Sequence, residues 1–203
     1  MAPRSNPSWP SGGAYSWNPA VTCELDADRF EALCFQASNE DLPDAARIEL
    51  YRQAVALYQG DLLPKLNHQM WLIPLSVHYH TLYLEAVKAL AALLDRAELF
   101  DEMQLVCQRA SSLDNLDEGL HTLIVRSLLR QGKDAAALDH YEKATDLLYR
   151  NLGVRPSEEL RALYTEIMAT EKTLETDLGA IMADLKETAA RPGAFVCEYG
   201  FFR

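Results

Sequence analysis

Two segments of the chain repeat each other at an offset of 34 residues. Residues 97–110 (AELFDEMQLVCQRA) align with residues 131–144 (QGKDAAALDHYEKA). The aligned positions with a packing role are Met103 and Ala137, Cys107 and Tyr141, and Ala110 and Ala144. A fixed period of this length is typical of solenoids, in which each repeat buries its apolar face against its neighbours. We therefore expect the chain to fold as a stack of similar units.

The offset is the period of tetratricopeptide repeats, whose unit is a pair of antiparallel helices. Apolar residues spaced by three or four predict helices near 77–95, 98–112, 117–131 and 133–151. The aligned first helices share the buried positions Leu90 and Ile124, Ala91 and Val125, and Leu94 and Leu128. Because a stable stack needs about three repeats, segment 26–76 is expected to add an N-terminal pair. The predicted fold class is all-α, a tetratricopeptide-like superhelix of antiparallel helix pairs with a long C-terminal helix.

Two regions outside the repeats are predicted to be loops. Residues 1–22 are rich in Pro, Ser and Gly, which indicates a flexible arm with a short extended piece at 14–17. In segment 60–76, Pro64 and Pro74 surround an apolar cluster, and proline disfavours the interior of a helix. We expect a packed loop formed by Leu62, Leu63, Leu66, Trp71 and Leu72.

Residues 149–167 (YRNLGVRPSEELRALYTEI) carry the signals of a joint between two helices. Gly153 can adopt the left-handed conformation that closes a helix, and Pro156 disfavours helix at the residue before it. Ser157 can accept a hydrogen bond from the free N–H groups of the next helix, whose positive end also favours Glu158 and Glu159. One helix is predicted to end near residue 151 and a second, which caps the stack, to begin at Ser157.

The helix predicted over 157–189 carries a seven-residue apolar repeat. Its candidate dimer seam consists of Leu160, Ile167, Leu174, Leu178, Ile181 and Leu185. Such a seam can pair two chains as a coiled coil, which makes a homodimer one interpretation. The other is a helix that packs on the repeat stack over its first half and is solvated beyond it. Glu171 and Gly179 weaken the coiled coil.

Charge and cysteine content exclude several functions. The chain has 19 Lys and Arg against 30 Asp and Glu, a formal net charge of −11, so its bulk surface should repel nucleic acid phosphates. The four cysteines lack a Cys-x-x-Cys pair, which predicts reduced thiols. The sequence shows no signal peptide and no apolar run of membrane-spanning length. We expect a cytoplasmic protein with no membrane partner.

We expect no enzyme, metal or cofactor. His78 and His80 are two residues apart and point to different sides of a helix, whereas metal ligands on one helix lie three or four apart. Neither a nucleophile elbow nor a Gly-rich phosphate loop occurs in the sequence. We interpret the five histidines as exposed or core-edge residues and assign no catalytic, cofactor-binding or metal-binding residue.

The inner side of the stack, formed by the first helix of each pair, is the remaining candidate surface. Such a surface can take an extended peptide or a helix. The candidate partner groove consists of Glu85, Lys88, Asp95, Arg96, Thr122, Arg126 and Arg130. The alternative is a solvated, mixed-charge face with internal ion pairs.

Four motifs occur in a characteristic order: AVALYQGDLLP (54–64), Trp71, LDEGLHTLIVRSLLRQGKDAAALDHYEKATDLL and LGVRPSEELRALYTEI. Over residues 24–168 the chain resembles the bacterial transcriptional activator domain of regulators of the Streptomyces antibiotic regulatory protein (SARP) type. The resemblance implies a helical regulatory domain that follows an OmpR-like winged helix. It also implies contacts with a second copy, adjacent domains or RNA polymerase. The winged helix is absent here, so DNA binding is expected only through a missing domain.

The expected organisation is a flexible arm or linker (1–22), a tetratricopeptide-like domain (23–168), a helical extension that is a candidate coiled coil (169–190), and the start of a further domain or linker (191–203). We interpret the chain as the regulatory and protein-interaction domain of a bacterial transcriptional regulator in signal transduction. Two alternatives stay open. One is a repeat scaffold unrelated to transcription. The other is a small-molecule sensor with a pocket between the repeats and the helix at 157.

Overall fold

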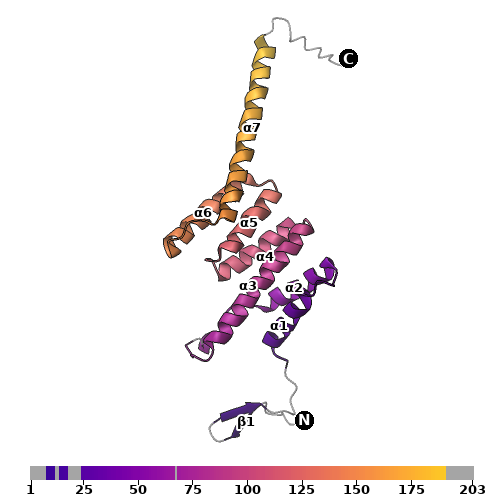
Figure 1. Cartoon of the computed structure of the whole chain (residues 1–203), viewed down its shortest axis with the longest axis vertical. Helices are drawn as coiled ribbons and strands as arrows, with labels where there is room; N and C mark the ends of the chain where they lie inside the picture. Colours follow the sequence, from indigo (N-terminus) through magenta and orange to yellow (C-terminus); the bar gives the residue numbers. More distant parts are fainter. Residues whose placement is uncertain (1–7, 12–13, 18–23, 67, 191–203) are drawn as a thin grey trace, which may run out of the picture. The chain divides into compact units, whose positions relative to one another are not determined.

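The computed structural model describes residues 8–11, 14–17, 24–66 and 68–190. Apart from one short hairpin, the regular secondary structure of these residues is helical (Figure 1). The chain divides into two compact units, Met1–Leu93 and Leu94–Arg203. The long helix α3 (Ile73–Arg96) contributes residues to both units. The predicted all-helical, tetratricopeptide-like class is confirmed.

The first unit contains a β-hairpin and a helix pair. Strand β1 (Ser8–Ser11) pairs antiparallel with β2 (Ala14–Trp17), which confirms the extended piece predicted in the arm. Helices α1 (Asp26–Ala37) and α2 (Asp44–Leu57) form the N-terminal pair predicted from the repeat argument. The buried side chains of this pair are Phe30, Leu33, Cys34, Ala37, Ile48, Tyr51, Ala54 and Val55.

The segment between α2 and α3 differs from the packed loop predicted there. A short 3₁₀ helix, η1 (Pro64–Leu66), interrupts it, and α3 begins at Ile73 rather than near 77. Pro74 is compatible with this start because a helix's first turn needs no intrahelical N–H donor. Leu72 is buried, but Trp71 is 59% exposed. Leu63 and Leu66 are also exposed, at 50% and 40%, so the predicted apolar cluster is wrong.

The second unit contains α4 (Phe100–Leu113), α5 (Glu118–Arg130), α6 (Asp134–Leu152) and α7 (Glu158–Ala190). Helix α5 contacts α4, α6 and α7, and α6 also contacts α7. Met103, Cys107, Ala110, Ala137 and Ala144 are buried, which confirms the repeat register read from the sequence.

The turns of the two repeats are equivalent in conformation. Glu98 and Gly132 occupy the same position in the two repeats and have φ of 58° and 68° respectively. This left-handed region suits glycine and strains a residue with a Cβ atom. The first repeat therefore keeps the shape of the turn although its sequence disfavours it.

Cys34 and Cys107 are free, buried thiols, as predicted. Burial, with a smaller contribution from Glu31, raises the pKa of Cys34 to about 11, and burial raises that of Cys107 to about 12. Cys23 and Cys197 lie outside the described residues. None of the helices in the described ranges is long and apolar enough to cross a membrane.

Candidate functional site

The joint between α6 and α7 has the local structure that its sequence predicts. Gly153 has a φ of 67° and its N–H donates to the carbonyl oxygen of Tyr149 at 2.9 Å, which closes α6. A Cβ atom there would meet no neighbouring atom, so glycine is needed for the backbone conformation rather than for space.

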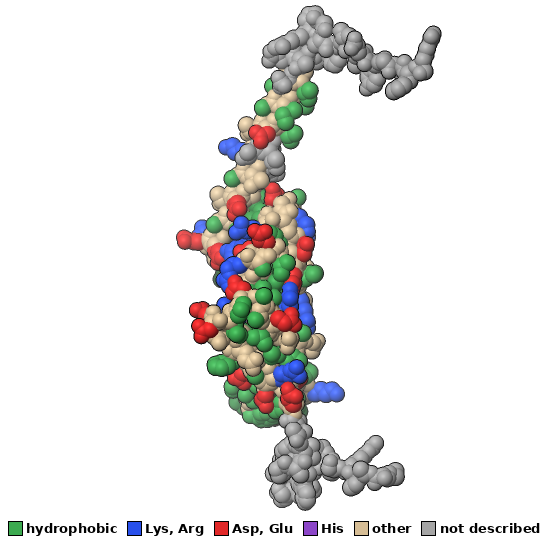
Figure 2. Space-filling view, turned by 90° about the vertical axis from the view of Figure 1, so that its right-hand side faces the viewer, with side chains coloured by type: hydrophobic (Ala, Val, Ile, Leu, Met, Phe, Trp, Pro, Cys, Tyr) green, Lys and Arg blue, Asp and Glu red, His purple; other side chains and the backbone are tan. Residues whose placement is uncertain are grey.

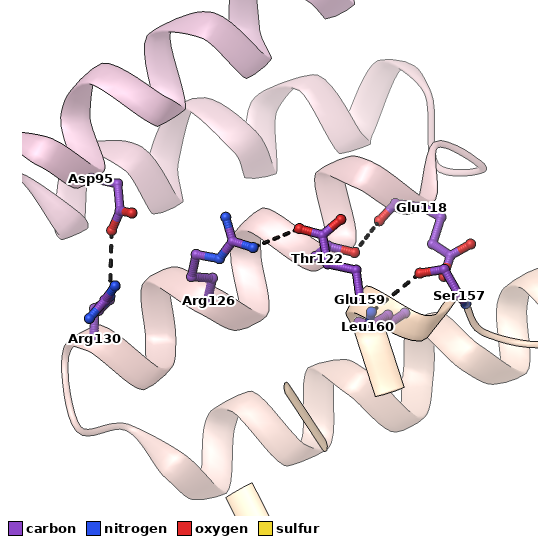
Figure 3. Close-up of polar contacts among 8 residues, drawn as sticks. All are labelled: Asp95, Glu118, Thr122, Arg126, Arg130, Ser157, Glu159 and Leu160. Carbon is purple, nitrogen blue, oxygen red and sulfur yellow. Dashed lines mark hydrogen bonds and ion pairs between the residues drawn. The ribbon is translucent and has the colours of Figure 1, made fainter. Parts of the chain in front are cut away.

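The N-terminus of α7 is held by two oxygen acceptors (Figure 3). The Ser157 hydroxyl oxygen accepts from the Leu160 N–H at 3.2 Å, which confirms the predicted cap. The Ser157 N–H itself donates to Glu118 Oε1 at 2.6 Å. Glu118 is the first residue of α5, so its carboxylate joins the starts of α5 and α7.

An ion pair gives the joint a second attachment. Arg126 Nη2 on α5 lies 2.6 Å from Glu159 Oε1 in the first turn of α7 (Figure 3). The Arg126 side chain is 32% exposed and that of Glu159 is 64% exposed. Together with Glu118, this pair fixes where α7 leaves the helix pair α5–α6.

The candidate partner groove is largely committed to contacts within the chain. Arg126 pairs with Glu159, and Arg130 Nε lies 3.6 Å from Asp95 Oδ1. That distance is an ion pair but too long for a hydrogen bond, and Asp95 Oδ1 has no hydrogen-bond partner among the described residues. These contacts match the mixed-charge alternative for the second-unit part of the groove.

The remaining groove residues differ in accessibility. Thr122 is buried and its hydroxyl donates to the Glu118 carbonyl oxygen at 3.0 Å, so its inclusion in an open groove is wrong. Glu85 and Arg96 are exposed and Lys88 is half-buried. Lys88 and Arg96 also take part in intramolecular interactions.

The proximal part of α7 is part of the core. Leu160, Leu163 and Ile167 are 0%, 8% and 2% exposed, and α7 contacts both α5 and α6. Tyr164 stacks on Tyr141 of α6 with ring centroids 4.8 Å apart. The assignment of Leu160 and Ile167 to a dimer seam is therefore wrong, because both side chains already pack within their own chain.

The distal part of α7 carries exposed apolar residues. Leu178, Ile181, Met182 and Leu185, here named the distal stripe, are 61%, 56%, 54% and 59% exposed. In the space-filling view, hydrophobic side chains gather along this part of the helix (Figure 2). Met182 was missed by the seven-residue repeat, although its spacing of four from Leu178 indicates the same face. The side chain of Leu174 lies outside the described ones.

The distal stripe repeats the pattern of the buried proximal face. Each of its members follows a proximal residue by 18 positions: Leu160 and Leu178, Leu163 and Ile181, Tyr164 and Met182, Ile167 and Leu185. Eighteen residues make about five full turns of an α-helix, so each pair points in the same direction. One continuous face of α7 is therefore buried near the joint, apart from Tyr164 at 36% exposed, and exposed beyond it.

One histidine pair was also missed by sequence reasoning. His121 Nδ1 lies 3.1 Å from His140 Nε2, and His121 Nε2 lies 2.9 Å from the Asn115 carbonyl oxygen. The carbonyl can only accept, so His121 Nε2 carries the proton and its Nδ1 accepts from His140. Burial, followed by His121, lowers the pKa of His140 to about 4.

These contacts satisfy helix ends and pair opposite charges, which is the chemistry of structural support. Within the described ranges, no group of three or more His, Cys, Asp or Glu is arranged to hold a metal ion.

Comparison with known proteins places this arrangement in a family. The family model of the bacterial transcriptional activator domain matches residues 25–168. EmbR from Mycobacterium tuberculosis, solved in complex with a low-affinity phosphopeptide, is similar with a TM-score of 0.61 and 20% identity over 87% of this chain and 48% of that chain. The Hsp90 co-chaperone Cns1 from Saccharomyces cerevisiae (delta69) is similar with a TM-score of 0.62 and 11% identity.

The match to Cns1 covers 82% of this chain and 46% of that chain, so this chain spans about half the length of both solved proteins. At these identities the likeness shows the fold. Comparison with curated proteins gave no match. Because the family match covers well over half of the sequence, the chain belongs to the bacterial transcriptional activator domain family, which makes it a helical regulatory domain.

Proposed function

We propose that this regulatory domain acts through protein contacts, and that its distal stripe pairs two copies of the chain. The observation that carries the proposal is the change in burial along one face of α7. Ile167 is 2% exposed and Leu185, which points in the same direction, is 59% exposed. An amphipathic helix whose apolar face is unpaired among the described residues gains stability by packing that face against another helix.

The pattern favours a helical partner. The proximal face uses the same spacing to pack on α5 and α6, and the distal stripe offers apolar residues at i, i+3, i+4 and i+7. That spacing is the seam geometry of paired helices. A second α7 is the simplest partner with the same repeat, and two-fold pairing is the commonest form of protein assembly.

The pairing should be of modest affinity. Gly179, next to Leu178 in the sequence, costs about 1 kcal/mol of helix stability relative to alanine. The segment 170–190 also has more Asp and Glu than Lys and Arg, so parallel copies repel each other. With four apolar side chains per helix in the seam, we expect a dissociation constant in the micromolar range. This corresponds to a binding free energy of roughly −8 kcal/mol.

The joint gives this pairing a defined geometry. Glu118 and Arg126 hold the first turn of α7 on α5. The direction of α7 is therefore set by the helices on which it packs, α5 and α6, here named the repeat body. A dimer through α7 would place two repeat bodies at a fixed spacing. Where such a domain is joined to winged helices, this would set the spacing of two of them on promoter DNA and present a joint surface to RNA polymerase or an adjacent domain.

Sedimentation velocity over a concentration series tests the proposal. The variant Leu178→Glu/Leu185→Glu places charge in the seam and should sediment as a monomer where the wild type shows dimer. Leu105→Glu is the control, because Leu105 is 66% exposed on α4, outside the seam. A wild type that stays monomeric throughout, or a dimer that survives the double substitution, would reject the pairing.

A further inference from the structure

The first unit contains a cavity of about 520 Å³ that the dimer proposal does not use. It is bounded by the start of α1, the end of α2 with the loop that follows, and one residue of α3. Its described lining includes Asp26, Phe30, Tyr58, Asp61, Leu63 and Tyr79. The volume lies within the range of small-molecule sites, which is about 300–1,000 Å³.

Three aromatic rings from three segments line this cavity. The ring centroid of Phe30 lies 6.0 Å from that of Tyr58 and 6.4 Å from that of Tyr79. The ring planes are tilted by 43° and 52°, so the rings do not stack into a flat wall. A cation within about 6 Å of a ring centroid is attracted by the negative face of the ring. Phe30 and Tyr58 are 3% and 8% exposed and Tyr79 is half-buried, so the ring surface that a cation can reach is mainly that of Tyr79.

Acidic residues give the cavity a negative potential. Asp26 and Asp61 line it, and the described lining contains no Lys or Arg. Burial raises the pKa of Tyr79, with further contributions from Glu31, Asp28 and Asp26. Burial and Asp61 likewise raise the pKa of Tyr58. Tyr79 therefore lies near three carboxylates and Tyr58 near one, and these negative charges attract a cation.

The rim of the cavity has a strained backbone. Leu63 has a φ of 48°, a left-handed conformation that a residue with a Cβ atom rarely adopts. Gly60, at φ 131°, adopts a conformation reserved for glycine. Both belong to the GDLLP motif, whose role the joint and the distal stripe leave unexplained. Strained residues cluster at ligand-binding loops, because the surrounding structure holds them in place for function.

We propose that this cavity binds a small organic cation, an ammonium or guanidinium group on an apolar body. The aromatic rings and leucines would cover the body, and the rings and the two aspartates would stabilise the charge. A phosphate or carboxylate ligand would be repelled by Asp26 and Asp61. A neutral apolar ligand would gain nothing from those carboxylates.

NMR titration of the whole 203-residue chain with benzyltrimethylammonium chloride, at constant ionic strength, tests this site. Saturable amide shifts are expected around residues 26–31, 57–64 and 79. Benzyl alcohol and sodium benzoate are matched neutral and anionic probes of the same ring. Both should bind at least about threefold more weakly, because they lack the favourable charge.

Substitutions separate the charge from the rings. Asp26→Asn/Asp61→Asn should weaken cation binding about three- to tenfold and leave benzyl alcohol unchanged. Tyr79→Leu, which keeps an apolar wall but removes a ring, should weaken it about threefold. Asp41→Asn, in the turn at the other end of the α1–α2 pair, is the control and should have no effect.

Three results would overturn the proposal. One is the absence of saturable amide shifts at benzyltrimethylammonium concentrations up to about 10 mM. Another is equal affinity for benzyl alcohol. The third is shifts centred on Phe35, Leu42 and Leu50, which line a separate hollow of the first unit and would indicate apolar adsorption. None of these outcomes bears on pairing through α7, so the two proposals fail separately.

Discussion

Shortening Leu160 to alanine should destabilise the chain far more than the same change at Leu185, although both residues lie on one face of one helix. Leu160 is fully buried against the repeat body, whereas Leu185 is 59% exposed. A buried Leu→Ala substitution loses the transfer free energy of the removed groups and leaves a cavity, which together cost about 2–5 kcal/mol. We expect about 3 kcal/mol for Leu160→Ala and less than about 0.5 kcal/mol for Leu185→Ala in the monomer.

Urea unfolding followed by circular dichroism at 222 nm measures both losses. With a slope of about 2 kcal/mol per molar urea, Leu160→Ala should lower the midpoint by about 1.5 M at an unchanged slope. Leu185→Ala should leave the midpoint unchanged at low protein concentration. At high protein concentration the wild type should gain stability from dimer formation, and Leu185→Ala should lack this gain. Equal losses for the two variants, or less than about 1 kcal/mol for Leu160→Ala, would refute the division of α7 into a packed and an exposed half.

Three further predictions concern single features of the fold. Glu98→Gly should raise the free energy of unfolding by about 0.5–1 kcal/mol, because glycine adopts the φ of 58° found at this position without strain. A variant that is less stable than the wild type in chemical denaturation would contradict this. A double-mutant cycle of Arg126→Gln and Glu159→Gln should give a coupling free energy of about 0.2–1 kcal/mol, as expected for a partly exposed ion pair. This coupling should fall as the salt concentration rises, and a coupling independent of salt would contradict the prediction. The pKa of His140 is lowered from 6.5 to about 4, so below pH 6.5 the unfolded chain binds a proton that the folded chain does not. Its contribution is complete above pH 6.5, and about 2 kcal/mol, allowing for solvent screening of this half-buried ring, should be lost as the pH falls towards 4. His140→Gln, whose amide can still donate to His121, should flatten that dependence in urea titrations at each pH, and an unchanged pH profile would exclude His140 as its source.

The parts of the fold that could be predicted rest on local or periodic signals. The 34-residue offset places Met103 and Ala137 at equivalent buried positions, and both are fully buried. Gly153 and Ser157 act on the backbone within a few residues of themselves, so their roles as helix stop and helix cap could be read directly.

The parts that could not be predicted depend on contacts between distant segments. Periodicity is the same for Leu160 and Leu178, and only the presence of α5 and α6 beside one of them decides which is buried. Trp71 is apolar enough for a core, but its side chain is 59% exposed. Hydrophobicity alone does not reveal whether a partner surface exists.

The candidate sites show the same limit. The ion pair of Arg126 with Glu159 joins residues 33 positions apart, and no local pattern connects them. The cavity in the first unit combines Asp26, Asp61 and Tyr79 from three separate segments. Each residue is ordinary in sequence, and their chemistry becomes visible only when the fold brings them together.

Light scattering of the full chain and of a chain ending at Ala169 tests pairing through α7 most directly. The shorter chain keeps Leu160, Leu163 and Ile167, which are buried in the repeat body, and loses the whole distal stripe. We expect the full chain to approach twice its monomer mass of 22.8 kDa as concentration rises, while the shortened chain stays folded and monomeric. A full chain that stays monomeric, or a shortened chain that still dimerises, would contradict it.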